Sequence, residues 1–229
     1  MDIEYKFPPM QHIVAPYFLG YLVFFVVALA LLLMYPKGDL HIMLNAVHTG
    51  ATDAFLSVYS KLAEWPLYVV AFLFFVYKKR YWWMGFYAVS EGVVALVITT
   101  LKHIFRMPRP SVFFGDEIGS LLPLVDGVKL HRGLSFPSGH TSTFFVFCTV
   151  GVILLGLHFM NNKEESGWRA NRLVRSTLFL IILLAALLGG YSRIYLSQHF
   201  LMDVFAGSMI GLFVPFALLP VFARRIDGK

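Results

Sequence analysis

The chain contains few charged residues and a single cysteine. Of its 229 residues, 14% are charged and 58% are hydrophobic, and the mean hydropathy is +0.71. A soluble domain carries about 25% charged residues, so this composition excludes that class and indicates an integral membrane protein. The lone Cys148 excludes an internal disulfide framework and a thiolate metal cluster. The sequence also lacks repeats and low-complexity linkers, so we expect residues 1–229 to form a single domain.

Long apolar runs are abundant instead. A transmembrane helix needs about 20 mainly apolar residues, and five runs meet this requirement. They are Tyr17–Tyr35, Tyr81–Leu101, Pro137–Met160, Leu173–Tyr191 and Phe200–Ala223. A sixth run, Trp65–Tyr77, is short, but it reaches a spanning length when it is extended back to Ala54 through Lys61 and Glu64, two charges that can pair on one helical face. We therefore predict an all-α integral membrane bundle of six transmembrane helices.

The net charge of +6 reflects membrane topology, and we expect no nucleic-acid partner. If six spans alternate, eleven of the 19 Lys and Arg residues fall on one side of the membrane. An excess of Lys and Arg marks cytoplasmic loops, so we expect this side to be cytoplasmic and both termini to face it. The eleven residues are Lys6, Lys78, Lys79, Arg80, Lys163, Arg169, Arg172, Arg175, Arg224, Arg225 and Lys229.

Two stretches fall outside the six spans. Pro36–Ser60 mixes apolar and polar residues, as expected of a helix that lies on the outer surface of the membrane. Arg106–Phe136 is an outer loop of about 30 residues that contains several prolines and glycines. Loops of this length without structure of their own are uncommon unless they are functional. We expect the central part of this loop, Val112–Leu130, to tune the choice of substrate.

Ionisable residues gather in three segments at the ends of spans, where the membrane makes them costly and therefore informative. By the alternation of the spans, all three segments lie on the outer side. They are Lys102–Pro110 at the end of the third span, Phe136–Thr141 at the start of the fourth, and Ser192–Asp203 between the fifth and the sixth. Segments that are far apart in sequence are thus predicted to converge on one face.

The residue types in these segments suit a phosphate group. Lys102, Arg109 and Arg193 offer positive charge and several hydrogen-bond donors for phosphate oxygens. Ser138 and Gly139 follow a proline at the start of a helix, where free backbone N–H groups and the positive end of the helix dipole favour an anion. The sequence therefore predicts a phosphate-binding site.

Two histidines in the same segments suit catalysis. His199 and Asp203 are four residues apart, so the carboxylate can hold one ring nitrogen while the other faces substrate. This arrangement fits an oriented nucleophile. His140 belongs to another helix and is free to protonate the leaving oxygen. The other six histidines show no spacing to a carboxylate that indicates a metal, so we expect no metal site.

The three segments resemble the signature of the type 2 phosphatidic acid phosphatase family. That signature reads Lys, six residues, Arg-Pro; then Pro-Ser-Gly-His; then Ser-Arg, five residues, His, three residues, Asp. The sequence matches it throughout. The resemblance implies a phosphohistidine at His199, support from Asp203, protonation by His140, and no metal or other cofactor. It also implies five phosphate-binding residues, namely Lys102, Arg109, Ser138, Gly139 and Arg193.

We therefore expect an enzyme that removes phosphate from a lipid phosphate or pyrophosphate at the outer leaflet of the inner (plasma) membrane, with its active site facing the periplasm or cell exterior. The compact size resembles the bacterial members of the family. These act on undecaprenyl pyrophosphate, phosphatidylglycerol phosphate, phosphatidic acid or the phosphates of lipid A. Of these substrates, we favour undecaprenyl pyrophosphate.

Three alternative functions can be compared by the residue pattern that each would require. A lipid-linked phosphotransferase would share every motif, because it differs only in the acceptor. A transporter should carry ionisable residues near the centre of several spans, whereas Glu91 is the only deep one here. A protein that merely binds phosphate would have no use for the His199–Asp203 pair opposite a second histidine. We expect Glu91 to hydrogen-bond within the bundle, with direct handling of the substrate as the alternative.

Overall fold

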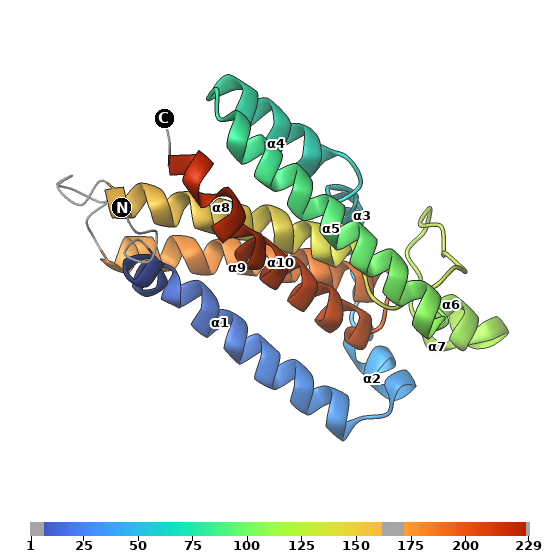
Figure 1. Ribbon diagram of the computed structural model, residues 1–229. Coiled ribbons are helices and arrows are strands. Elements are labelled where there is room, and N and C mark those ends of the chain that lie inside the picture. Colours follow the sequence, from blue (N-terminus) through green and yellow to red (C-terminus); the bar gives the residue numbers. More distant parts are fainter. Residues whose placement is uncertain (1–6, 162–171, 228–229) are drawn as a thin grey trace.

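The chain is almost entirely helical in the part that the computed structural model describes, residues 7–161 and 172–227 (Figure 1). In chain order the longer helices are α1 (Phe7–Met34), α2 (Lys37–Leu44), α3 (Gly50–Lys61), α4 (Pro66–Tyr77), α5 (Tyr81–Phe105), α8 (Gly139–Asn161), α9 (Arg172–Tyr195) and α10 (Leu201–Asp227). The outer loop contains two short helices, α6 (Pro110–Phe113) and α7 (Ile118–Leu121), and a 3₁₀ helix, Gly115–Glu117. An isolated bridge between Pro108 and Leu134 joins the two ends of this loop.

Five helices are long and apolar enough to cross a membrane, and they match the five runs expected from the sequence. They are α1, α5, α8, α9 and α10. The sixth expected span is not continuous, because α3 and α4 are separated by a short break and bent by 53°. Pro66 takes the first position of α4, where it has no N–H with which to continue the hydrogen bonds of α3. The structure therefore has five spans, or six if the bent pair is counted as one.

The break overturns one expected contact. On a continuous helix, Lys61 and Glu64 would share a face, but residues 62–65 form a turn. Among the ion pairs of the described residues, none joins Lys61 to Glu64. The carboxylate of Glu64 instead lies 4.0 Å from His140 Nε2 of α8. The bend thus redirects this carboxylate toward another helix.

Helix α8 is the axis of the bundle. It contacts α1, α4, α5, α9 and α10, and it is the most buried of the five spans. Its side chains Phe145, Val146 and Ile153 are completely buried. The other spans expose large apolar side chains such as Leu22 and Leu184, which suits contact with lipid because no water needs to be excluded there.

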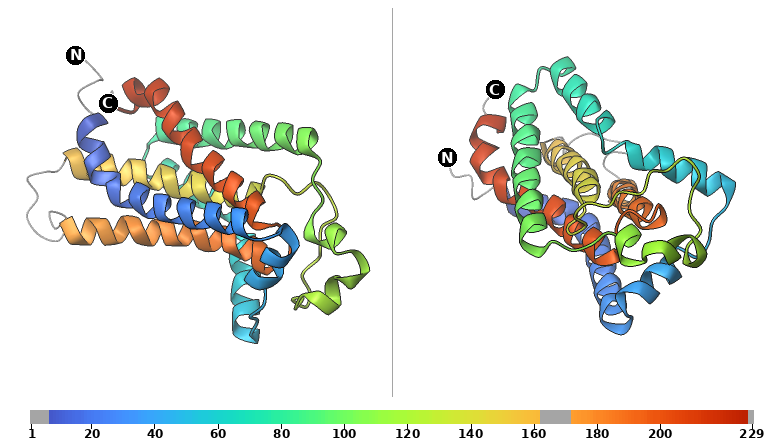
Figure 2. Two further views of the ribbon diagram at one scale, coloured as in Figure 1. Left: turned by 90° about the horizontal axis from the view of Figure 1, so that it is seen from below. Right: turned by 90° about the vertical axis from the view of Figure 1, so that its right-hand side faces the viewer.

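The helix ends divide the molecule into two faces. α1 begins, α10 ends, and α4 joins α5 at one end of the bundle (Figures 1 and 2). The short helices α2, α6 and α7 lie at the opposite end. This arrangement agrees with an even number of crossings. Of the basic residues used to predict the cytoplasmic side, Lys6, Lys163, Arg169 and Lys229 lie outside the described residues.

Glycines bring α9 and α10 against α8. A Cβ atom on Gly207 of α10 would lie 2.5 Å from the backbone oxygen of Ser138, and one on Gly211 would collide with the backbone oxygen of Ser142. On α9, a Cβ atom on Gly189 would collide with the ring of Phe144. Small residues of this kind let membrane helices approach closely, so these positions fix how the three polar segments are held relative to one another.

The stretch expected to form one surface helix forms two, α2 and α3. Thr49 caps α3 through reciprocal hydrogen bonds with Thr52. His41 and Asn45 are fully buried, and the ring of His41 packs against Phe200 with 5.0 Å between centroids. Polar residues of this stretch therefore face the protein as well as the membrane surface, because α2 and α3 both pack on α9.

The close contact of α10 with α8 gives a first prediction. Gly207→Ala should lower the free energy of unfolding by about 1–3 kcal/mol, the usual cost of overpacking, because the backbone oxygen that the methyl group meets cannot move alone. The measurement is thermal unfolding of the detergent-solubilised protein. Gly92→Ala on α5 is the matched control, since nothing lies within 4 Å of its added Cβ. Equal stability of the two variants would contradict the contact.

Candidate active site

The three polar segments meet at the end of the bundle that carries α2, α6 and α7 (Figure 2). Arg109 Nη1 lies 3.3 Å from His199 Nε2. The amide of Ser138 donates to the carbonyl oxygen of Asp203 at 3.0 Å. The structure therefore brings together residues from the end of α5, the start of α8 and the turn between α9 and α10.

The turn between α9 and α10 places His199. α9 ends at Tyr195, and the chain then reverses through Ser197, whose φ of 50° lies in the left-handed region that few residues other than glycine adopt. The amides of Gln198 and His199 both donate to the carbonyl oxygen of Arg193, at 2.9 and 3.0 Å. His199 is thus fixed immediately before α10 rather than within it.

The His199 ring is oriented by Asp203. Nδ1 lies 3.2 Å from Asp203 Oδ2, and both side chains are fully buried. Nε2 faces Arg109, which can only donate, so Nε2 carries the lone pair and Nδ1 carries the proton. Burial lowers the pKa of His199 to about 3, although the Asp203 carboxylate acts in the opposite direction. The imidazole is therefore neutral near pH 7, with an unprotonated nitrogen directed at the cations, as a nucleophile requires.

Three cations gather around the site, with Arg109 beside His199 Nε2, and none of them has a full set of partners. Lys102, Arg109 and Arg193 lie close enough to repel one another electrostatically. The Nε atoms of Arg109 and Arg193 are buried and have no hydrogen-bond partner among the described residues. Buried donors of this kind are costly unless they are satisfied. Each cation is bonded to a protein acceptor: Leu134 O for Lys102 (3.3 Å), Gln198 O for Arg109 (3.0 Å, besides His199 Nε2) and Ser60 Oγ for Arg193 (2.5 Å).

The start of α8 differs from the sequence expectation. The helix begins at Gly139, two residues after Pro137. Ser138 Oγ accepts a hydrogen bond from Thr141 Oγ1 at 2.9 Å, and its amide is already bonded to α10. The amide of Ser138 thus serves the fold, whereas its hydroxyl only accepts in these contacts, so its contact with phosphate stays a prediction. The amides of Gly139 and His140 form no hydrogen bond within the described residues, so these two remain for an anion at the positive end of α8.

Two residues that support the site have no signal in the sequence. Ser135 Oγ donates to Asp203 Oδ2 and is completely buried. Asn45 Nδ2 donates to the carbonyl oxygens of Ile194 and Tyr195, at 2.7 and 3.1 Å, so it ties α2 to the end of α9. Neither residue belongs to a motif, and neither is spaced regularly from another residue of the site. Each is brought to the site only by the tertiary fold.

Glu91 belongs to a polar cluster one turn beneath His140. Thr143 Oγ1 donates to Glu91 Oε2 at 3.4 Å, and it lies 2.8 Å from Tyr68 OH. The cluster links α4, α5 and α8. The expectation that Glu91 hydrogen-bonds within the bundle is therefore confirmed.

The geometry defines a class of protein: a membrane-embedded phosphoryl-transfer enzyme with a histidine at its centre. Comparison of sequences then gives the family. Residues 80–227 match the PAP2 superfamily, and the chain belongs to it. Groups of three or more His, Cys, Asp or Glu able to hold a metal ion do not occur among the described residues.

Named relatives agree with this class. Lipid A 4'-phosphatase of Porphyromonas gingivalis is 27% identical, over 77% of this chain and 68% of its own length. Dolichyldiphosphatase 1 of Mus musculus is 29% identical, over 83% of this chain and 72% of its own length. The crystal structure of the first transmembrane PAP2 type phosphatidylglycerolphosphate phosphatase from Bacillus subtilis has the same fold, with a TM-score of 0.60 at 21% identity over 90% of this chain and 96% of that chain. This chain is accordingly a multi-pass lipid phosphatase.

The role of Ser135 can be tested directly. Ser135→Ala removes a buried hydrogen bond to the Asp203 carboxylate, and a hydrogen bond to a charged group contributes about 1.5–3 kcal/mol. If that contribution is lost in the transition state, where the histidine becomes positively charged, kcat/KM should fall about tenfold or more. The measurement is phosphate release by the purified protein, with Ser120→Ala on the exposed outer loop as the control. Unchanged kcat/KM would show that Ser135 does not support the carboxylate.

Proposed function

We propose that this phosphatase cleaves its lipid substrate through a phosphohistidine on His199, without a metal ion. The observation that carries the proposal is the unprotonated His199 Nε2, which faces Arg109, while the buried Nε atoms of Arg109 and Arg193 have no hydrogen-bond partner among the described residues. In the first step, Nε2 attacks phosphorus, the bond from phosphorus to the lipid oxygen breaks, and His140 gives that oxygen a proton. In the second step, water attacks the phosphohistidine, His140 takes the proton of the water, and inorganic phosphate leaves.

Each protein group has a defined part in these steps. Asp203 holds the Nδ1 proton and stabilises the positive charge that the ring acquires. Lys102, Arg109 and Arg193, with the free amides at the start of α8, stabilise the charge on the oxygens of the transferring group, which is the main catalytic requirement in phosphoryl transfer. Ser138 is proposed to donate its hydroxyl proton to a phosphate oxygen while its Oγ caps the start of α8, and Gly139 allows the anion to approach.

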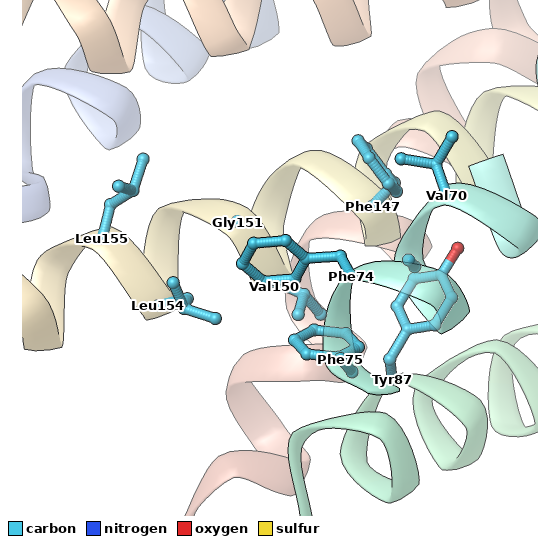
Figure 3. Close-up of a pocket in the computed structure, with 10 residues that line it drawn as sticks. Val70, Phe74, Phe75, Tyr87, Phe147, Val150, Gly151, Leu154 and Leu155 are labelled. Carbon is cyan, nitrogen blue, oxygen red and sulfur yellow. The ribbon is translucent and has the colours of Figure 1, made fainter. Parts of the chain in front are cut away.

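The lipid chain is proposed to enter a lateral apolar cavity between α4, α5 and α8 (Figure 3). The cavity has a volume of about 290 Å³ and is lined by Val70, Phe74, Phe75, Tyr87, Phe147, Val150, Gly151 and Leu154, among others. His140, Phe147 and Gly151 follow one another at helical spacing on one face of α8. The cavity begins about 10 Å below His140, at 1.5 Å of rise per residue, so a lipid whose phosphate is at His140 could place its chain there.

Undecaprenyl pyrophosphate is the substrate that we favour. Its hydrocarbon chain suits a cavity whose walls are almost wholly apolar, and its second phosphate suits the additional positive charge of Lys129, which acts electrostatically on His131 together with Arg109 and Arg193. The likeness to dolichyldiphosphatase 1, whose name denotes a polyprenyl diphosphate, supports this choice. Lipid A is the second candidate, because the Porphyromonas relative is named as a lipid A 4'-phosphatase.

The active site is proposed to face the outer leaflet of the inner (plasma) membrane. The described basic residues between α4 and α5 and at the start of α9 lie at the end of the bundle away from the site. An excess of such residues favours the cytoplasmic side. With this orientation, both termini are cytoplasmic and the site faces the periplasm or cell exterior.

Trapping of the intermediate tests the mechanism. Wild-type protein that is mixed with a substrate labelled with ³²P at the transferred phosphate and quenched in alkali should retain label, because phosphohistidine is stable there. His199→Ala should retain none and release no phosphate, and His140→Ala should lose about 10²- to 10⁴-fold in rate. His12→Ala, an exposed histidine at the far end of α1, is the control. Full activity of a folded His199→Ala protein in the presence of EDTA would overturn the proposal.

A panel of lipids tests the substrate. We expect kcat/KM to be higher for undecaprenyl pyrophosphate than for lipid A, phosphatidic acid or phosphatidylglycerol phosphate, each measured as phosphate release in the same detergent. Greater kcat/KM for lipid A would select the second candidate. Transfer of the labelled phosphate to a second lipid, instead of release into water, would identify a phosphotransferase.

A further inference from the structure

A carboxylate that the family motifs do not include lies beside the catalytic acid. Glu64 Oε1 is 4.0 Å from His140 Nε2, and that nitrogen is buried without a hydrogen-bond partner among the described residues. Slightly more than half of the Glu64 side chain is exposed, at 52%, so it can rotate to close the remaining distance. Catalytic hydrogen bonds are often long in the absence of substrate and shorten when substrate binds.

The position of Glu64 is set by the break between α3 and α4. Before the break, Ser60 Oγ accepts a hydrogen bond from Arg193 Nη1 of α9 at 2.5 Å. After it, Tyr68 OH lies 2.8 Å from Thr143 Oγ1 of α8, one turn beyond His140. The break is therefore anchored on both sides to the helices that carry the phosphate-binding arginine and the catalytic acid. A continuous helix would have turned Glu64 elsewhere.

The charges around His140 explain why a carboxylate is needed there. The groups that act on His140 from neighbouring elements are Arg193, Arg109, His131 and His199, all of which disfavour a second positive charge on this ring. The hydrogen bonds of Asp203 to His199, Ser135 and the amide of Phe200 all use Oδ2, at the nucleophile. Glu64 also acts electrostatically on Arg193 and His131.

We propose that Glu64 is the positioning residue of His140, as Asp203 is of His199. Its carboxylate accepts a hydrogen bond from Nε2, keeps the imidazole protonated among the cations, and leaves Nδ1 to give its proton to the leaving oxygen. The proposal rests on the phosphatase mechanism above and adds a fourth side chain to it. The site then contains two histidine–carboxylate pairs, one for the nucleophile and one for the acid.

Substrates with different leaving groups test this role. Phosphatidic acid releases an alkoxide that must be protonated, whereas p-nitrophenyl phosphate releases a stable phenolate that needs no acid. kcat/KM reports the steps up to breakage of the bond to the leaving group, so it isolates the first proton transfer. Glu64→Gln should lower kcat/KM for phosphatidic acid by about tenfold or more, within the range that acid catalysis contributes, and should leave that for p-nitrophenyl phosphate unchanged.

The controls separate the two proposals. Lys61→Gln removes a charge from the same break and should leave both substrates unaffected. Equal losses on both substrates for Glu64→Gln would indicate a structural role, and no loss on phosphatidic acid would indicate no role; either result overturns the inference about Glu64. A wild-type protein that cleaves neither substrate nor any lipid phosphate would instead contradict the proposed function.

Discussion

The structure depends on one electrostatic constraint: three cations and two histidines are held together in a largely buried site that contains one buried carboxylate. Asp203 Oδ2 is bonded to His199, Ser135 and a backbone amide, whereas Oδ1 has no hydrogen-bond partner among the described residues. A single carboxylate cannot neutralise three cations. Like charges at low dielectric repel strongly. The helices keep them together because each cation is attached to a different rigid element, and an anion is the partner that the arrangement lacks.

Helix α8 connects this charged site to the packing of the rest of the bundle. Its first turn supplies His140 and the free amides, and its sides are packed so closely by Gly189 and Gly207 that added methyl groups would collide. The amide of Ser138 is bonded to the backbone of Asp203 in α10. The proposed acid, His140, and the proposed nucleophile, His199, are therefore positioned by the same helix contact, although they are 59 positions apart in the chain. The same contacts between helices therefore determine both the packing of the bundle and the geometry of the active site.

The membrane helices and the motifs that form the site could be predicted from the sequence, because neither prediction requires knowledge of the tertiary structure. An apolar run such as Tyr81–Leu101 has no plausible state other than a membrane helix, and the charged motifs at the ends of such runs must meet if the spans alternate. The continuity of the sixth span was predicted wrongly. Its apolar content was judged correctly, but the bend depends on how Ser60 and Tyr68 are bonded to α9 and α8, which no local pattern encodes.

Other parts of the site could not be predicted for the same reason. Asn45 was assigned to a helix on the membrane surface, and an alternation of polar and apolar residues is indeed the same for a helix on lipid and for one on protein. Ser135 is a single serine in a loop. In the sequence, Lys61 stands at helical spacing from Glu64 and is its expected ion-pair partner. Only the bend between α3 and α4 shows that this ion pair does not form.

The lateral position of the cavity between α4, α5 and α8 has a consequence for how substrate arrives. In the proposed binding mode, a lipid held there would not leave the leaflet, since its chain would stay at hydrocarbon depth while its headgroup reached His140. Encounter would then be a two-dimensional search, governed by the surface density of the lipid and by its lateral diffusion. The aqueous phase would exchange only water and released phosphate with the site, so the membrane itself would act as the reservoir of substrate.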